Sequence, residues 1–188
     1  MRMRRTVLLT AAAAMLAGCG DRNLVLKVDV LSFMDPASRQ QDFGPIPTFP
    51  GGIWTGEIPV VTDQHVSLLQ GLSDAVTIKS VTLSFGARAI DYDGAGEDTV
   101  RIYMSNEQTD PRTTAPVLTQ SIVFSPGQTD TLRAVLGDDP RVMAIFASRQ
   151  MRVSVTTALR GPVLGNPLSG RLVLTGIDGV VIAGSKGF

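Results

Sequence analysis

The densest group of side chains able to bind a metal ion lies between residues 91 and 98. It consists of Asp91, Asp93, Glu97 and Asp98. Calcium takes about six to eight oxygen ligands, and acidic turns that contain glycine can supply several of them. An EF-hand loop counted from Asp91 fails, because Ala95 and Ile102 stand where that loop needs side-chain ligands. Two interpretations remain open: a calcium site completed by another loop, and a solvated hairpin turn that favours aspartate and glycine for backbone reasons.

Aromatic side chains and prolines gather between residues 34 and 54. The candidate binding residues there are Phe43, Phe49 and Trp54, the only tryptophan of the chain. The segment is long for a loop inside a compact domain, and such loops are often functional. Rings held between prolines would form a rigid platform for a sugar, a peptide or a partner protein. The alternative is that the three rings fold back and cover one open end of the domain.

Catalytic groups are sparse in this sequence. One cysteine and one histidine exclude an intramolecular disulfide, zinc fingers and most cysteine–histidine catalytic systems. His65 has only Asp63 as a close carboxylate in the sequence, and the chain has neither a Gly-x-Ser-x-Gly motif nor a glycine-rich phosphate loop. We therefore expect the protein not to be an enzyme.

The first nineteen residues have the pattern of a secretory signal. Three arginines among the first five residues precede an uncharged run over residues 7–16, which is too short to span a bilayer. The ending Leu-Ala-Gly-Cys at residues 16–19 resembles the lipobox of bacterial lipoproteins. In that family the cysteine thiol is lipidated, the chain is cut just before the cysteine, and the new N-terminus is acylated.

The resemblance implies that Cys19 is the lipid attachment point. Residues 1–18 would be removed, residues 19–23 would form the lipidated N-terminus and a short tether, and residues 24–188 would form the folded domain. Two or three acyl chains would hold this domain on the extracytoplasmic face of a membrane. Gly20 occupies the position where aspartate tends to mean inner-membrane retention in enterobacterial lipoproteins, so the outer membrane is favoured in an organism that has one.

The remainder of the chain has the pattern of an all-β protein. Valine and threonine are abundant, and apolar residues alternate with polar ones in runs such as Asn23 to Phe33 and Thr77 to Phe85. Turn residues separate these runs, which predicts a single β-sandwich domain with Greek-key-like connections. A change in the parity of the apolar residues predicts a β-bulge near Lys79 and Ser80.

Local signals predict one helix and one tight hairpin. A short helix is expected near residues 140–149, with Asp139 as its cap, Pro140 in its first turn and a position at one end of the sandwich. The dipeptide Asp178-Gly179 predicts a two-residue hairpin between two strands.

The charge balance limits the partners. The 17 basic and 17 acidic residues give a net charge of 0, which excludes a strongly basic nucleic-acid-binding protein. Loss of the three arginines of the signal peptide leaves the mature domain slightly acidic. The expected partners are a membrane, through acyl chains on Cys19, and an envelope protein or glycan.

The sequence therefore predicts a membrane-anchored cell-envelope lipoprotein with a non-enzymatic binding or scaffolding role. The alternative is a calcium-stabilised carbohydrate-binding or adhesion module centred on the acidic residues 91–98. A metal-dependent hydrolase is the second alternative. No cofactor is expected for the first of these functions, and calcium is expected for the carbohydrate-binding alternative.

Overall fold

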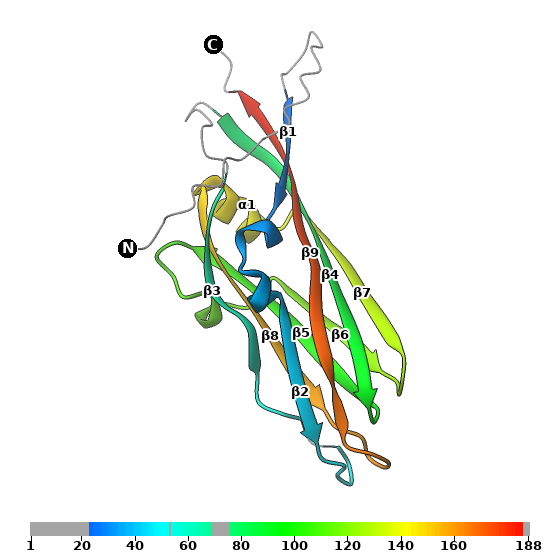
Figure 1. The fold of residues 1–188 in the computed structure, drawn as a ribbon. Coiled ribbons are helices and arrows are strands. Elements are labelled where there is room, and N and C mark those ends of the chain that lie inside the picture. The colour runs from blue at the N-terminus through cyan, green and yellow to red at the C-terminus, as the bar shows by residue number, and fades with distance from the viewer. Residues whose placement is uncertain (1–22, 53, 69–75, 186–188) are drawn as a thin grey trace, which may run out of the picture.

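The computed structural model describes residues 23–52, 54–68 and 76–185, which form a β-sandwich with one short α-helix (Figure 1). The fold class predicted from the sequence is therefore confirmed. The signal peptide and Cys19 lie outside the described residues. None of the helices within the described ranges is long and apolar enough to cross a membrane.

Nine strands build two antiparallel sheets from the described residues. The first sheet contains β1 (Asn23–Asp29), β2 (Gln40–Ile46), β4 (Val76–Asp93), β7 (Thr129–Gly137) and β9 (Leu168–Ser185). The second contains β3 (Ile58–Ser67), β5 (Gly96–Asn106), β6 (Leu118–Phe124) and β8 (Gln150–Arg160). The strand orders are β1-β9-β4-β7 and β3-β8-β5-β6, and β2 also pairs with β9.

Alternating residues on the strands build the core between the two sheets. On β4, the side chains of Val81, Leu83 and Phe85 are buried, as their shared parity predicts. They join one apolar cluster to which the inward-facing residues of both sheets contribute. The bulge is also confirmed, because the register of β4 against β9 shifts between Ile78 and Ser80.

The helix α1 (Pro140–Ala147) bridges the two sheets. The Asp139 carboxylate accepts hydrogen bonds from two backbone N–H groups of the first turn, and Pro140 occupies that turn, as the sequence predicts. The buried side chains of α1 are Val142, Ile145 and Phe146. Because α1 contacts β4 in one sheet and β5 and β8 in the other, it ties the two layers together. The short 3-10 helices are η1 (Leu31–Phe33), η2 (Pro36–Arg39) and η3 (Pro111–Thr113).

The hairpin predicted at Asp178 and Gly179 is wrong. β9 continues through both residues, and Gly179 pairs with Val28 on one side and Leu83 on the other. The glycine serves packing, since a Cβ atom at this position would lie 3.2 Å from the Phe146 ring. Pairing on both sides outweighs the local turn preference of this dipeptide, because strand formation depends strongly on tertiary context.

The segment from residue 34 to residue 54 is not the long loop that the sequence suggests. Residues 36–39 form η2, and residues 40–46 form β2, which pairs with β9. Pro45 is tolerated in β2 because the strand lies at a sheet edge, where one row of backbone N–H groups has no partner strand. The loop proper is therefore shorter and begins after Ile46.

The start of β1 lies at one end of the sandwich, and two loops project from the other end. Asn23 pairs with Gly184 near the C-terminal end of β9, so the chain enters the domain at that end. The loops that follow β2 and precede β9 project at the opposite end (Figure 1). We call the described residues of these loops, 47–52, 54–56 and 161–167, the tip. The 18 residues of β9, at about 3.3 Å per residue, separate the two ends by roughly 60 Å.

Candidate functional site

The tip lies within two stretches of sequence that contain no charged residue. Neither Phe43 to Gly56 nor Gly161 to Gly170 contains aspartate, glutamate, lysine, arginine or histidine. Charged residues resume immediately outside these stretches, at Asp42, Glu57, Arg160 and Arg171. Proline recurs in both stretches and restricts the backbone. The tip is thus an uncharged structure on a sandwich that carries charges of both signs.

Hydrogen bonds join the two loops of the tip. The backbone N–H of Phe49 donates to the carbonyl oxygen of Pro162 at 3.2 Å. The hydroxyl of Thr48 donates to the carbonyl oxygen of Gly165 at 2.7 Å. Because segments more than one hundred residues apart in the sequence hold each other, the tip forms one surface.

Arg160 fixes the base of the tip. Its guanidinium donates to the carbonyl oxygen of Gly51 at 2.7 Å and lies 6.0 Å from the centre of the Trp54 ring, within cation–π range. Beside it, the backbone N–H of Thr55 donates to the carbonyl oxygen of Leu159 at 2.7 Å, and the N–H of Leu159 donates to the Thr55 hydroxyl at 3.0 Å. The Trp54 loop is therefore bound to the end of β8.

Glu57 is the first charged residue after the tip loop that contains Trp54. Its hydrogen bonds attach the chain to the outer face of the second sheet. Its carboxylate accepts hydrogen bonds from the Arg101 guanidinium at 3.0 Å and from the hydroxyls of Tyr103 and Thr156, each at 3.1 Å. Burial and the adjacent Glu57 carboxylate raise the pKa of Tyr103, which keeps its hydroxyl protonated as a donor. This network fixes the point at which the loop returns to the sandwich.

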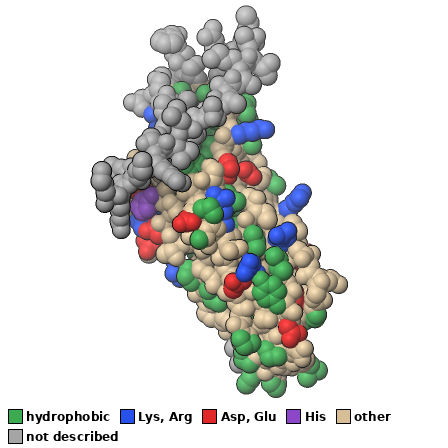
Figure 2. Space-filling view, viewed as in Figure 1, with side chains coloured by type: hydrophobic (Ala, Val, Ile, Leu, Met, Phe, Trp, Pro, Cys, Tyr) green, Lys and Arg blue, Asp and Glu red, His purple; other side chains and the backbone are tan. Residues whose placement is uncertain are grey.

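Four large apolar side chains are exposed on the tip. Their exposed fractions are 85% for Leu164, 50% for Phe49, 49% for Val163 and 44% for Trp54. Figure 2 shows hydrophobic side chains gathered at this end of the molecule. Single exposed apolar residues are common, whereas a cluster on neighbouring loops is a feature typical of interaction surfaces.

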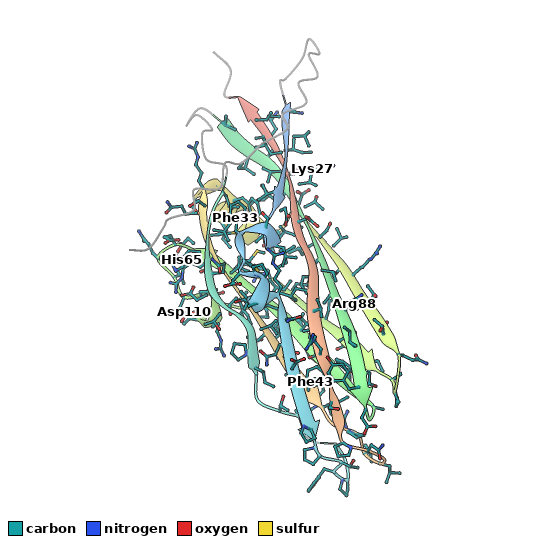
Figure 3. The ribbon with its side chains drawn as sticks, viewed as in Figure 1. Lys27, Phe33, Phe43, His65, Arg88 and Asp110 are labelled. Carbon is teal, nitrogen blue, oxygen red and sulfur yellow. The ribbon has the colours of Figure 1, made fainter. Side chains whose placement is uncertain are left out.

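The three aromatic residues predicted to bind together do not lie on one surface. Phe43 is buried, and its ring meets the Phe124 ring edge-on, with centroids 5.0 Å apart and planes inclined at 79°. Figure 3 places Phe43 on β2, in the part of the sandwich next to the tip. Phe49 and Trp54 remain on the surface. The sequence analysis did not identify Val163 and Leu164. The feature that could have pointed to them is the absence of charged residues from the stretch in which they lie.

Strand alternation and a register shift together separate the acidic residues 91–98. Glu97 and Asp98 face opposite sides of β5, and the pairing of β4 with β9 shifts between Asp91 and Asp93. Asp91 on β4 and Asp98 on β5 are buried within the sandwich. Asp93 is the exposed last residue of β4, and its carboxylate accepts hydrogen bonds from the Gly94 N–H at 2.8 Å and the Asn166 amide at 3.0 Å. Within the described part of the chain, no three histidine, cysteine, aspartate or glutamate side chains group as metal ligands would. Calcium binding by this segment stays a prediction.

Burial alters the protonation of two of these carboxyl groups. Desolvation raises the pKa of Asp98 to about 7, against the opposing effect of a hydrogen bond from the Thr157 hydroxyl. Burial also raises the pKa of Asp91. Glu97 instead lies half-buried in β5, opposite Arg160 of β8. The acidic segment therefore contains two buried carboxyl groups of altered acidity rather than four carboxylates around one point.

His65 belongs to a surface network of ion pairs (Figure 3). Its Nδ1 lies 2.8 Å from a Glu107 carboxylate oxygen, and its Nε2 lies 3.8 Å from Asp63. Hydrogen bonds from Arg152 to Asp63 lower the pKa of that carboxyl group against some desolvation. The network joins β3 and β8 to the segment after β5, and it gives no support to the metal-dependent hydrolase alternative.

Comparisons with known proteins add a weak likeness of fold. No protein-family model and no curated protein matches the chain. A solved structure described as "CBM4 structure and function" is 17% identical, with 84% of this chain and 79% of that chain covered and a TM-score of 0.27. The 2.6 Å structure of T=1 particles derived from infectious bursal virus is 13% identical, with 91% and 42% covered and a TM-score of 0.29. Likeness at this level carries no argument about function.

Proposed function

We propose that this protein is a lipid-anchored component of the cell envelope that binds a partner through the tip and performs no catalysis. The observation that carries this proposal is the cluster of exposed apolar side chains on two uncharged loops held together by hydrogen bonds. Exposing such a cluster to water is unfavourable, so proteins keep one where a partner covers it.

The positions of the two ends support this arrangement. A lipid on Cys19 would be separated from β1 by only three residues, so the anchor would lie near the end where β1 begins. The tip lies at the other end of β9. A domain standing on its anchor would therefore present the tip away from the membrane, where envelope proteins and glycans can reach it.

The anchor has a direct test. Mass spectrometry of the mature N-terminus is expected to find a chain that begins at Cys19 and carries acyl groups. An unmodified Cys19, or a chain cleaved elsewhere, would contradict this part of the proposal. The favoured outer-membrane location is tested separately by fractionation of the envelope.

Binding through the tip is tested by site-specific photo-crosslinking in the native envelope. A crosslinking residue at Phe49 or Val163 is expected to capture one defined product. The same residue at Val135, which is exposed on β7 away from the tip, serves as the matched control and is expected not to form that product. Equal products from all three positions, or none from the tip, would overturn the assignment of the tip.

A second candidate function is a carbohydrate-binding or adhesion module, which the half-exposed rings of Phe49 and Trp54 favour. Aromatic faces stack on the C–H faces of sugars, and Trp54 reports on such contacts as the only tryptophan of the chain. Titration with envelope polysaccharides, with and without calcium, is expected to shift the Trp54 emission under this function. An unchanged emission would remove it.

A further inference from the structure

We infer that the tip inserts its apolar side chains into the surface of a second lipid bilayer, opposite the bilayer that holds the acyl chains on Cys19. This inference rests on the proposed function and names the chemistry of the partner. The partner of the tip is then a lipid bilayer, which the apolar side chains enter at the boundary between the headgroups and the hydrocarbon. The protein thereby links two membrane surfaces.

The absence of charge is the first argument for a bilayer. The stretches Phe43 to Gly56 and Gly161 to Gly170 would carry no charge into the interface. Dehydrating a charge next to hydrocarbon is costly, whereas the side chains of valine and leucine enter with a gain. Partners recognised through ion pairs would instead require charges on these loops.

The order of side chains along the tip is the second argument. Leu164, an aliphatic residue, is the most exposed of the four apolar side chains. Trp54 and Arg160 lie at the base, where the two residues form a β-bridge. Tryptophan favours the membrane–water interface, and an arginine there keeps its charge among the headgroups while its stem contacts apolar surface. The tip thus has an aliphatic end and an interfacial base.

The hydrogen-bond donors of the tip favour hydrocarbon over sugar. The Thr48 hydroxyl already donates to Gly165, the Asn166 amide to Asp93, and the Arg160 guanidinium to Gly51. Sugar recognition requires polar groups that can bond to hydroxyls, and each of these three side chains already donates a hydrogen bond within the protein. An apolar contact with hydrocarbon requires none of them.

The direction of the tip points to a bilayer other than the anchoring one. The loops project at the far end of the sandwich (Figure 1), and only three residues separate Cys19 from β1. The four Cα–Cα steps from Cys19 to Asn23 reach at most about 14 Å, while β9 alone spans roughly 60 Å. A domain that stands upright on its anchor therefore carries the tip to a surface other than the anchoring bilayer, whereas a domain that lies flat would bring the tip to its own bilayer.

The emission of Trp54 tests the inference in the acylated protein. The protein is reconstituted through its own lipid into phosphatidylcholine donor vesicles and mixed with acceptor vesicles that contain phosphatidylcholine brominated on its acyl chains. Bromine quenches tryptophan only at short range. We expect the Trp54 emission to be quenched by brominated acceptor vesicles and the two vesicle populations to cluster.

A matched pair of valines supplies the variants. Val163→Asp places a charge on the tip, and Val135→Asp places the same charge on an exposed site of β7. Because both side chains are exposed, neither substitution disturbs the core. Val163→Asp is expected to weaken association with acceptor vesicles roughly tenfold or more, whereas Val135→Asp is expected to leave it unchanged.

Each other outcome overturns the inference in a distinct way. In a second arrangement the brominated lipid is placed in the donor vesicles instead of the acceptor vesicles. Quenching only in this arrangement would place the tip on its own membrane and contradict the second bilayer. Absence of quenching in both arrangements would exclude a bilayer. The proposed function would then survive if tip-specific photo-crosslinks still form in the envelope, and it would fail with the inference if they do not.

Discussion

The tip and the acidic segment, residues 91–98, are both recognisable in the sequence as clusters of one residue type. In the folded protein the tip gathers its side chains on the surface, whereas the acidic segment has its side chains separated. The tip keeps Phe49 and Trp54 on the surface and adds Val163 and Leu164 from another loop. In the acidic segment, Asp91 and Asp98 are buried within the sandwich. A cluster in the sequence therefore becomes a surface where its residues lie in loops. On the strands it is divided, because Glu97 and Asp98 face opposite sides of β5 and a register shift in β4 lies between Asp91 and Asp93.

The largest expected effect separates the buried and exposed aromatic residues. Phe43→Ala removes a ring packed against Phe124 and should lower the free energy of unfolding by about 3–5 kcal/mol. Phe49→Ala removes a half-exposed ring and should change it by no more than about 0.5 kcal/mol. Urea unfolding followed by circular dichroism measures both values. A similar decrease in the free energy of unfolding for both variants would contradict the assignment of Phe43 to the core and of Phe49 to the surface.

The second prediction concerns the buried carboxyl group of Asp98. Its pKa rises on folding from 3.8 to about 7, so its contribution to stability is fully present below the unfolded pKa and is lost as the pH rises through about 7. The loss is on the order of 4 kcal/mol. The groups around it include the Thr157 hydroxyl and the more distant charge of Arg101, both of which act against this rise.

Thermal unfolding between pH 4 and pH 9 measures this loss. Asp98→Asn should remove most of the pH dependence and raise the melting temperature above pH 7, whereas the matched variant Asp93→Asn, at the exposed end of β4, should retain the decline. A wild-type melting temperature that stays constant or rises over this range would show that Asp98 is not held in its neutral form.

The third prediction concerns the base of the tip. Arg160→Ala removes the hydrogen bond to Gly51 and the contact with the Trp54 ring, at a cost of about 1 kcal/mol. The Trp54 emission should shift to longer wavelength as the loop loosens. Arg171→Ala, which removes an exposed ion pair with Asp42 outside the tip, should leave that emission unchanged. Identical emission in both variants would mean that Arg160 does not position the loop.

The smallest expected effect is that of calcium. Since the carboxylates of residues 91–98 do not converge, millimolar calcium should leave the melting temperature unchanged. Differential scanning calorimetry with and without a chelator checks this. A rise that Asp93→Asn abolishes would instead support the calcium-stabilised alternative.

Features fixed by local chemistry could be predicted from the sequence. Asp139 and Pro140 define the start of α1 because capping and a restricted backbone act within one turn. The inward row on β4 follows from alternation alone, and the bulge near Ser80 follows from the change in that alternation. The β-sandwich follows from many such strands.

Features fixed by distant partners could not be predicted. β9 passes straight through Gly179 because β1 and β4 flank it, and no local signal reveals those neighbours. Phe43 enters the core because β2 adds to the edge of β9. The tip itself needs two loops that meet only in the folded protein, so Leu164 could not be linked to Trp54 from their positions in the chain.

The central claim, that the tip is covered by a partner in the envelope, has one direct measurement. Acylation would block the thiol of Cys19, the only cysteine of the chain, so Val163→Cys and Val135→Cys would each provide a single reactive thiol. Maleimide labelling rates are compared between intact envelopes and purified protein. We expect labelling at residue 163 to be slowed several-fold in envelopes and labelling at residue 135 to be unchanged. Equal rates at residue 163 in both preparations would contradict the account.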